Sequence, residues 1–307
     1  MNNKISSLTR KVYQKLHARM IKKGASNKDI QKDIYDSLDK SFGIDPKYFK
    51  DKIVLDAGCG SEGTVFFELL TKLKCKHVYA FDVGSSFKKN LIQLAKKKKI
   101  PSSRYTLASG ALPNVPFKQK FDIVICNGVL IHLKNIKEIK KAFKNLSNLT
   151  KKNGYFFSLY GNAGGLIQES IFPAIRSYYR KNKVFKDFID NLNEKNISSY
   201  ITEFSKKIKK YYGEKIQEKY LKKMFDEVFI QFLHNYIQAP TWCSNETTPK
   251  FVENLYKKNG FKKIIRIKKF VKRKNIRKYF SVFHYNNNSI LSKVLYGDGY
   301  VTYLGKK

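Results

Sequence analysis

The sequence predicts an α/β protein whose central sheet is mostly parallel, preceded by helices and interrupted by a helical insertion. Three observations support this class. Short apolar strands alternate with helical segments from residue 49 onward, three glycines follow the first strand closely, and residues 162–246 have almost no strand pattern. With 307 residues, 42% of them hydrophobic, the chain has enough apolar surface for a sizeable core.

Residues 1–48 are expected to form a separate helical segment. From Leu8 to Ile21 apolar residues recur every fourth position, which is typical of an amphipathic helix, and a second helix is expected from Asn27 to Phe42. The start lacks the continuous apolar core of a signal peptide, and no run in the chain approaches the ~20 apolar residues that cross a bilayer. Together with four cysteines that lack disulfide-like spacing, this favours a cytoplasmic protein.

Residues 49–161 carry the alternating pattern of a parallel sheet. Strand–helix–strand units of this kind make right-handed crossovers, so successive strands run in the same direction. The last strand of the segment is expected to begin after a turn at Asn153-Gly154. The expected strands are 53–55, 78–81, 121–126 and 155–159, and the expected helices are 64–73, 87–99 and 136–149.

Residues 162–246 are interpreted as a helical insertion, and residues 247–307 as the part that completes the sheet. Helical patterns in the insertion cover 167–180, 183–192 and 217–232. The alternation of helix and strand resumes with 248–258 and 261–267, and a final strand is expected at 300–304.

The turn after the first strand is the feature most closely tied to chemistry. It reads Val54-Leu55-Asp56-Ala57-Gly58-Cys59-Gly60-Ser61-Glu62-Gly63. Gly58, Gly60 and Gly63 have the spacing of a dinucleotide-binding loop, so a nicotinamide dinucleotide is one candidate ligand. Asp56 argues against it, because a carboxylate there would repel a pyrophosphate, whereas it suits an ammonium group or the ordering of the loop.

Four segments in order resemble the class I S-adenosylmethionine-dependent methyltransferases, particularly the small-molecule group related to the ubiquinone-biosynthesis and type 11 enzymes. They are the glycine turn, Phe81-Asp82-Val83, the segment 121–133 and the segment 151–157. The resemblance covers residues 49–159 well and the last two strands more loosely. It implies a Rossmann-like sheet of seven strands, S-adenosylmethionine as the cofactor, and a helical lid after the fifth strand.

The resemblance also implies which residues hold the cofactor. Asp82 lies 24 residues after Gly58, where such enzymes place the acid that binds the ribose hydroxyls, as dinucleotide enzymes also do. The family commonly has an acid for the adenine amino group before the fourth strand. This chain has none there, and Ser109 or a backbone carbonyl is expected to accept instead. The expected cofactor set is Asp56, Gly58, Cys59, Gly60, Ser61, Asp82, Val83, Ser109, Gly110, Ala111, Asn127, Gly128 and Val129.

His132 is the candidate catalytic residue. It follows the fourth predicted strand, at the edge where α/β sheets bind ligands. Methyl transfer needs an aligned acceptor, and it needs a base only where the acceptor must lose a proton. His132 is therefore interpreted either as a general base or substrate-orienting residue, or as a residue that caps a helix. No metal is expected, because the five histidines are scattered without ligand spacing.

Candidate acceptor-binding residues follow the fifth strand and lie near the end of the insertion. His234, Tyr236 and Gln238 alternate, so on an extended segment they would face one side. Ordinary packing of a lid is the alternative interpretation. The expected acceptor contacts are Tyr160, Asn162, His234, Tyr236 and Gln238.

A net charge of +38 leaves several partners open. Only eight of the 62 basic residues are Arg, and an excess of Lys, Asn, Ile, Tyr and Phe matches A/T-rich codons, whereas nucleic-acid recognition draws on Arg. An acidic small substrate or a membrane surface is a further interpretation of the charge.

A small-molecule methyl acceptor is favoured over a nucleic acid. Neither an Asn/Asp-Pro-Pro-Tyr/Phe element nor a Pro-Cys pair, both typical of nucleic-acid methyltransferases, occurs in the chain. One alternative is a tRNA or rRNA methyltransferase, supported mainly by the basic segment Lys268–Lys278, which is otherwise an edge strand with a solvated face. The other is an inactive relative that binds RNA or a protein partner.

Overall fold

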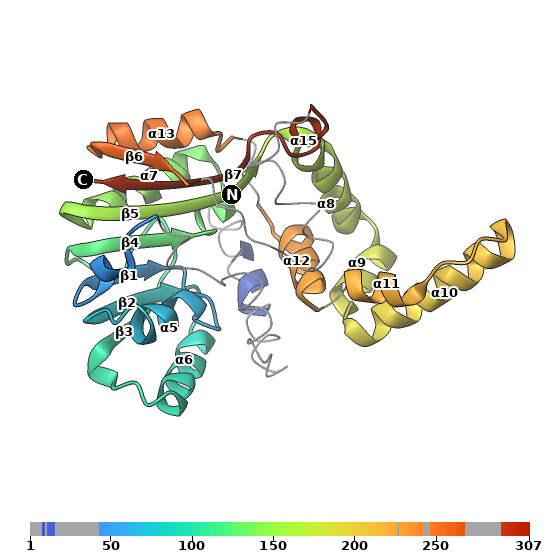
Figure 1. The fold of residues 1–307 in the computed structure, drawn as a ribbon, viewed down its shortest axis with the longest axis horizontal. Coiled ribbons are helices and arrows are strands. Elements are labelled where there is room, and N and C mark those ends of the chain that lie inside the picture. The colour runs from blue at the N-terminus through green and yellow to red at the C-terminus, as the bar shows by residue number, and fades with distance from the viewer. Residues whose placement is uncertain are drawn as a thin grey trace.

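Seven strands form one sheet in the computed structural model, in the order β3-β2-β1-β4-β5-β7-β6 (Figure 1). The structure describes residues 8–9, 11–15, 43–225, 227–241, 243, 246–267 and 290–307. The strands are β1 (Ile53–Ala57), β2 (His77–Asp82), β3 (Tyr105–Ser109), β4 (Phe121–Asn127), β5 (Thr150–Ala163), β6 (Lys263–Arg266) and β7 (Gly299–Lys306).

The five strands that come first in the chain are parallel to one another, and β7 runs antiparallel between β5 and β6. The chain order reverses at β1, which pairs with β2 on one side and β4 on the other. Open sheets bind ligands outside the carboxyl ends of the strands at such a reversal. The predicted fold class, a mostly parallel seven-stranded sheet, is confirmed.

Helices cover both faces of the sheet because successive strand residues point to opposite sides. Val54 faces a core shared with α5 (Thr64–Thr71) and α6 (Ser86–Lys97). Leu55 faces the second core, shared with α7 (Ile136–Asn148) and α13 (Pro249–Lys258). The short elements α4 (Pro46–Phe49), η1 (Ser102–Arg104) and η2 (Leu130–His132) lie in the connections.

Between β5 and α13 the described chain is helical. A π-helical turn (Ile167–Ile171) leads into α8 (Phe172–Lys181), followed by α9 (Lys183–Asn191), α10 (Glu194–Tyr212), α11 (Glu218–Met224) and α12 (Glu227–Gln238), and α15 (Ile290–Tyr296) precedes β7. In Figure 1, α10 and α11 extend away from the sheet as an arm, while α12 lies nearer the sheet edge. The helical character of the insertion agrees with the prediction. The division of the chain into four segments stays a prediction.

Some local predictions were wrong. The strand β5 begins at Thr150, so Asn153-Gly154 lies within the strand, where the pairing with β4 shifts register. The helix expected at 217–232 is two helices, and the second continues to Gln238. Helix α10 was not predicted. The second N-terminal helix and the basic segment Lys268–Lys278 lie outside the described residues.

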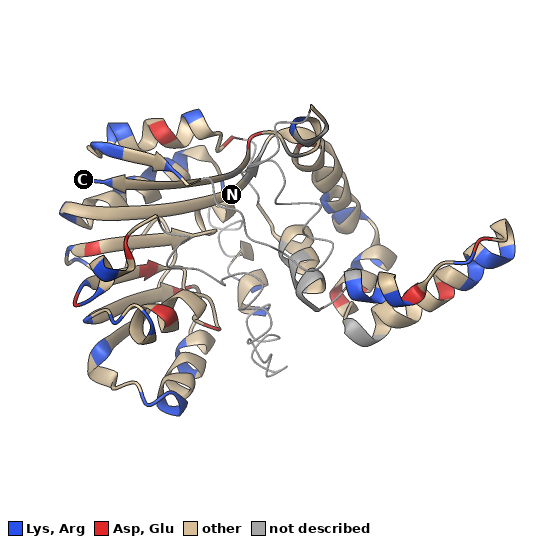
Figure 2. Cartoon of the chain, viewed as in Figure 1, with Lys and Arg blue, Asp and Glu red and all other residues tan. Residues whose placement is uncertain are grey.

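Lys and Arg are present on the helices of both the sheet region and the helical arm (Figure 2). Within the part of the chain that the structure describes, no helix is long and apolar enough to cross a membrane. All four cysteines are buried and free.

Candidate cofactor and acceptor site

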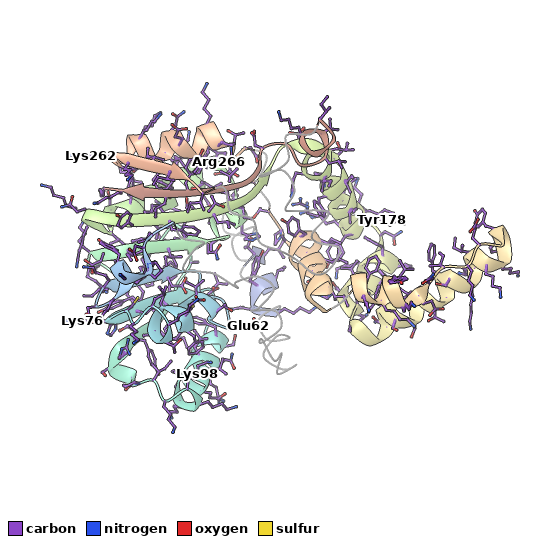
Figure 3. The ribbon with its side chains drawn as sticks, viewed as in Figure 1. Glu62, Lys76, Lys98, Tyr178, Lys262 and Arg266 are labelled. Carbon is purple, nitrogen blue, oxygen red and sulfur yellow. The ribbon has the colours of Figure 1, made fainter. Side chains whose placement is uncertain are left out.

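The carboxyl ends of β1, β2 and β4 bring three predicted site residues to one edge of the sheet. Asp56 is the fourth residue of β1, Asp82 ends β2 and Asn127 ends β4. Since β1 lies between the other two strands, these side chains converge at the point where the chain order reverses. In Figure 3, Glu62 lies on the same side of the sheet, toward the N-terminal helix, whose described residues are 8–9 and 11–15.

Asp56 is the most unusual acid of this edge. Its side chain is 1% exposed, and among the described residues its Oδ2 accepts no hydrogen bond. Burial, reinforced by the neighbouring carboxylate of Asp82, raises the pKa of Asp56 to about 8. A buried carboxyl oxygen without a donor is costly, so this position favours a ligand that brings a cation or an N–H group.

Backbone geometry after β1 explains the glycines. Gly58 has φ +88°, and a Cβ there would lie 2.2 Å from Cγ2 of Val129, so only glycine fits. The amides of Gly58 and Cys59 donate to the carbonyl of Phe81 at 2.8 and 3.1 Å, which ties the loop to the end of β2. By contrast, a Cβ on Gly60, at φ +68°, would meet no atom within 4 Å, so the loop is open at that point.

Asp82 fixes the loop from the other side. Its Oδ2 accepts from the amide of Gly60 at 2.7 Å, and its Oδ1 accepts from the amide of Val83 at 2.6 Å. Each carboxylate oxygen has two lone pairs, so Asp82 keeps acceptor capacity for ribose hydroxyls. Ser61 is buried beside this loop, and its Oγ has no hydrogen-bond partner in the described part of the chain.

The remaining predicted cofactor residues flank this centre. Ser109 is exposed at the end of β3, opposite Asp82 in the strand register, and the amide of Gly110 donates to the Asp82 carbonyl at 3.0 Å. Ala111 forms an isolated bridge with Asn114 a few residues further on. On the other side, the amide of Gly128 donates to the carbonyl of Leu159 at 3.0 Å, which holds the residue after β4 against β5.

His132 is held by a residue that the sequence did not single out. The hydroxyl oxygen of Tyr13, on the N-terminal helix, lies 2.9 Å from both ring nitrogens of His132. The backbone of His132 accepts from Thr241 Oγ1 at 2.6 Å. Burial, with a contribution from Arg176, lowers the pKa of His132 to about 4, so the imidazole is neutral at neutral pH.

Tyr13 is the meeting point of four segments that are far apart in the sequence. Burial raises the pKa of Tyr13, and the groups that act on it next are Asp82, Tyr236 and Arg176. The N-terminal helix therefore packs between the sheet edge and the insertion, as Figure 1 shows. Nothing in the sequence could have marked Tyr13, because its hydrogen bond is to His132, 119 positions away.

The predicted acceptor residues do not form one group. His234, Tyr236 and Gln238 are on the helix α12, so the condition under which they would face one side, an extended segment, is not met. Tyr236 contributes to the raised pKa of Tyr13 and packs on Phe172, with ring centroids 4.8 Å apart. His234 is buried.

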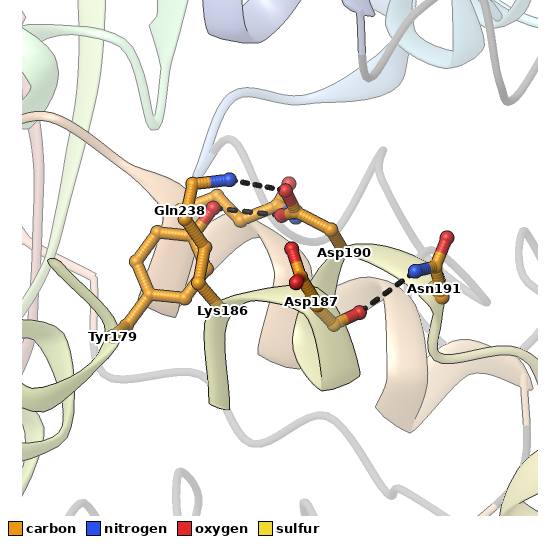
Figure 4. Close-up of polar contacts among 6 residues, drawn as sticks. All are labelled: Tyr179, Lys186, Asp187, Asp190, Asn191 and Gln238. Atoms are coloured by element: carbon orange, nitrogen blue, oxygen red, sulfur yellow. Dashed lines mark hydrogen bonds and ion pairs between the residues drawn. The ribbon is translucent and has the colours of Figure 1, made fainter. Parts of the chain in front are cut away.

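Other predicted acceptor residues lie elsewhere. Gln238 Nε2 donates to Asp190 Oδ1 at 2.8 Å, within a network of the insertion (Figure 4). Tyr160 is fully buried in the core that packs on α7 and α13. Asn162 pairs with Tyr300 in the β5–β7 ladder.

The residues at this edge fit the cofactor that the resemblance implies. Asp56 offers a buried acceptor for an ammonium group, Asp82 offers one for hydroxyls, and the open face of Gly60 allows close approach of the backbone. Within the described residues, no group of three or more His, Cys, Asp or Glu side chains is placed to hold a metal ion.

The sheet order and the acid-tipped glycine turn define a Rossmann-like class I methyltransferase fold. The model of the family described as a methyltransferase domain matches residues 49–228, more than half of the chain. The chain therefore belongs to this family, the class I S-adenosylmethionine-dependent methyltransferases. The resemblance seen in the sequence is confirmed, and with it the cofactor at the level of the family.

Individual relatives are more distant. The malonyl-[acyl-carrier protein] O-methyltransferase of Priestia megaterium is 27% identical over 167 residues, which cover 50% of this chain and 55% of that protein. The chain thus spans about half the length of this curated relative. The solved structure of PKMT2 from Rickettsia typhi covers 87% of this chain and 51% of its own, with TM-score 0.53 and 16% identity. Its complex with AdoHcy covers the same shares, with TM-score 0.50 and 18% identity. This similarity concerns the fold.

Proposed function

We propose that this protein transfers the methyl group of S-adenosylmethionine to a small-molecule acceptor, at the sheet edge between Asp82 and His132. The observation that carries the proposal is the joint arrangement of a buried acid, Asp56, an acid-braced glycine turn and a neutral His132 held by Tyr13. The first two suit a charged nucleoside, and the third lies where an acceptor would approach.

The chemistry of methyl transfer determines what the cofactor supplies and what the protein must supply. When bound, the cofactor supplies an electrophilic methyl on a sulfonium, which departs as a neutral thioether when an acceptor lone pair attacks the carbon. The chain's own part is to hold the two reactants in line, which accounts for several kcal/mol of barrier lowering, about 7 to 11 at best. The turn with Asp56 and Asp82 binds one reactant, and the insertion with the N-terminal helix surrounds the other.

His132 serves the acceptor side. An imidazole with a pKa of about 4 is neutral at pH 7, so it offers a lone pair but has little tendency to keep a proton. It therefore orients an acceptor by hydrogen bonding, and takes a proton only where the acceptor must lose one. Tyr13 fixes the ring through its hydroxyl group.

Helices α8 and α12 together with the N-terminal helix act as the lid. The proposal of a lid is supported by Arg176 on α8 and Tyr236 on α12, which both act on the pKa of Tyr13. Water excluded by such a cover strengthens the electrostatic interactions inside.

A labelled methyl-transfer assay tests this function. Protein is incubated with S-adenosylmethionine carrying a labelled methyl group and with the small-molecule or the RNA fraction of a cell extract. Label is expected in small molecules, and His132→Gln should lower the rate about tenfold to a hundredfold by loss of an orienting contact. His77→Gln, at the opposite end of the sheet where His77 bonds Thr106, is the matched control and should stay within about twofold. Label in RNA, or in neither fraction, would contradict the proposal.

A further inference from the structure

Gln14 of the N-terminal helix packs directly on the backbone of Gly84, shortly after the end of β2. A Cβ built on Gly84 would lie 2.6 Å from Nε2 and 2.8 Å from Cγ of Gln14, so the Gln14 side chain occupies the space that any larger residue would need. Gly84 also has φ +84°, a conformation that glycine adopts without strain. Gln14 therefore lies against the chain segment that follows Asp82, the acid expected to bind the ribose.

The residue before Gln14 makes the second contact of this helix with the sheet edge. The hydroxyl oxygen of Tyr13 lies 2.9 Å from the ring nitrogens of His132, and the centroids of the two rings are 4.9 Å apart. His132 ends η2, the short helix that follows β4. Two adjacent residues of the N-terminal helix thus contact the chain just after β2 and just after β4.

These two contacts place the N-terminal helix across the carboxyl end of β1. In the sheet, β1 lies between β2 and β4, and neighbouring strands are about 4.8 Å apart, so β2 and β4 are separated by about 10 Å. A helix with its side chains has about this diameter. A nucleoside held between the glycine turn after β1 and Asp82 would therefore lie next to the Gln14 side chain.

We propose that Gln14 is a further cofactor-binding residue, whose carboxamide binds the nucleoside part of S-adenosylmethionine beside Asp82. The inference rests on the proposed function and adds a residue of the N-terminal helix to its cofactor side. A carboxamide has an NH₂ donor and a carbonyl acceptor, so it can bond both hydroxyl groups and ring nitrogens, whereas an ionised Asp82 only accepts. Being neutral, the Gln14 side chain also adds no positive charge beside the sulfonium, unlike the lysines of the same helix, Lys11 and Lys15.

Calorimetric titration with two ligands tests the role of Gln14 without turnover. One ligand is S-adenosylhomocysteine, and the other is methylthioadenosine, which has the same nucleoside but lacks the amino-acid part. Gln14→Leu keeps the bulk that packs on Gly84 and removes the donor and the acceptor, so it should weaken the binding of both ligands by the same factor, about fivefold to tenfold. Gln14→Ala also removes the packing and should weaken both at least as much.

Lys11→Ala is the matched control for Gln14→Ala, since it truncates an exposed side chain of the same helix. It should keep the affinity for both ligands within about twofold. An unchanged midpoint of thermal unfolding shows that each variant is folded.

Two results would overturn the inference about Gln14. Wild-type affinity in Gln14→Leu would reduce Gln14 to a packing residue, and a loss confined to S-adenosylhomocysteine would place the contact at the amino-acid part of the ligand. Failure of the methyl-transfer assay together with the expected binding losses would instead refute the proposed function alone. Methyl transfer together with full ligand affinity in Gln14→Leu would refute this inference alone.

Discussion

The sheet edge and the helical insertion build their parts of the site in different ways. At the edge, backbone amides of Gly58, Cys59 and Gly60 are held by groups of β2, so the loop shape depends on main-chain geometry. In the insertion, side chains hold the helices together, and Asp190 accepts from Tyr179 at 2.7 Å and from Gln238.

The sheet edge and the insertion also differ in how deeply their side chains are buried. The strands β1 and β4 are almost fully buried, whereas the insertion keeps many large apolar side chains exposed. These are Leu166, Ile171, Tyr178, Val184, Tyr200, Phe204, Tyr211, Tyr212 and Tyr220. In Figure 3, Tyr178 points away from the sheet. The edge is therefore the more deeply buried half of the site, and the insertion is the more exposed half.

The largest expected effect is the difference between a glycine substitution at the sheet edge and one in the insertion. Gly58→Ala places a Cβ 2.2 Å from Val129 at φ +88°, so overpacking and backbone strain should cost about 3 kcal/mol and abolish detectable S-adenosylhomocysteine binding. Gly213→Ala, in the insertion at φ +71° with no atom within 4 Å, should cost about 1 kcal/mol and leave binding intact. Denaturant unfolding and calorimetry measure both. Equal loss of stability in the two variants would contradict the contrast.

Asp82→Ala should have the next largest effect. It removes the acceptor for the Gly60 and Val83 amides as well as the expected ribose contact, so affinity for S-adenosylhomocysteine should fall about a hundredfold, or about 3 kcal/mol. Asp122→Ala is a control at the other end of the sheet, where Asp122 Oδ2 accepts from the amide of Ile53. Calorimetry should show its affinity unchanged. A similar loss in both variants would remove Asp82 from the binding role.

Proton release upon binding should report on Asp56. With a pKa of about 8, its carboxyl is mostly protonated at pH 7, and a ligand ammonium group favours the ionised form, so binding should release up to one proton. Affinity should rise as the pH increases from 6 to 8, by at most about tenfold per pH unit. Calorimetry in buffers of different ionisation enthalpy counts the proton. Asp56→Asn should abolish the release; a release that persists in this variant would exclude Asp56 as its source.

The carboxyl of Asp56 should also make the stability of the ligand-free protein depend on pH, and stability should fall where affinity rises. The ordinary pKa of this carboxyl is 3.8, and in the folded protein it is about 8. At a pH between these two values Asp56 is protonated in the folded protein and ionised in the unfolded chain. Stability of the ligand-free protein should therefore decrease as the pH rises through this window, and Asp56→Asn should remove that contribution. Chemical unfolding at about pH 5.5 and about pH 8.5 measures the slope.

The smallest expected effect lies in the insertion. Burial alone would raise the pKa of Asp190, but hydrogen bonds from Lys186 and Tyr179 lower it on balance (Figure 4). Asp190→Asn loses the ion pair with Lys186 and should cost about 1 kcal/mol of stability, with no change in S-adenosylhomocysteine affinity. Asp187→Asn on the same helix is the control, because the backbone carbonyl of Asp187 and not its side chain accepts from Asn191. A loss of cofactor affinity in Asp190→Asn would show that the two regions are coupled.

The sequence predicted the edge far better than the insertion. Strand tips and glycine turns are local: Asp56, Gly58 and Asp82 could be identified because a few adjacent residues determine their backbone geometry. Tyr13 and Gln14 could not, since their neighbours are defined by helix packing across distant segments. The alternation of His234 and Tyr236 did not indicate a shared face, because a short pattern does not distinguish an extended segment from a helix and these residues are on α12.

The central claim is that the edge formed by β1, β2 and β4 binds the nucleoside cofactor. Titration of S-adenosylhomocysteine into the purified protein by calorimetry tests it most directly. We expect one site per chain with a dissociation constant of about 1 to 10 μM, or a binding free energy of about −7 to −8 kcal/mol. No heat of binding at a ligand concentration of about 1 mM, with the protein shown to be folded, would contradict it.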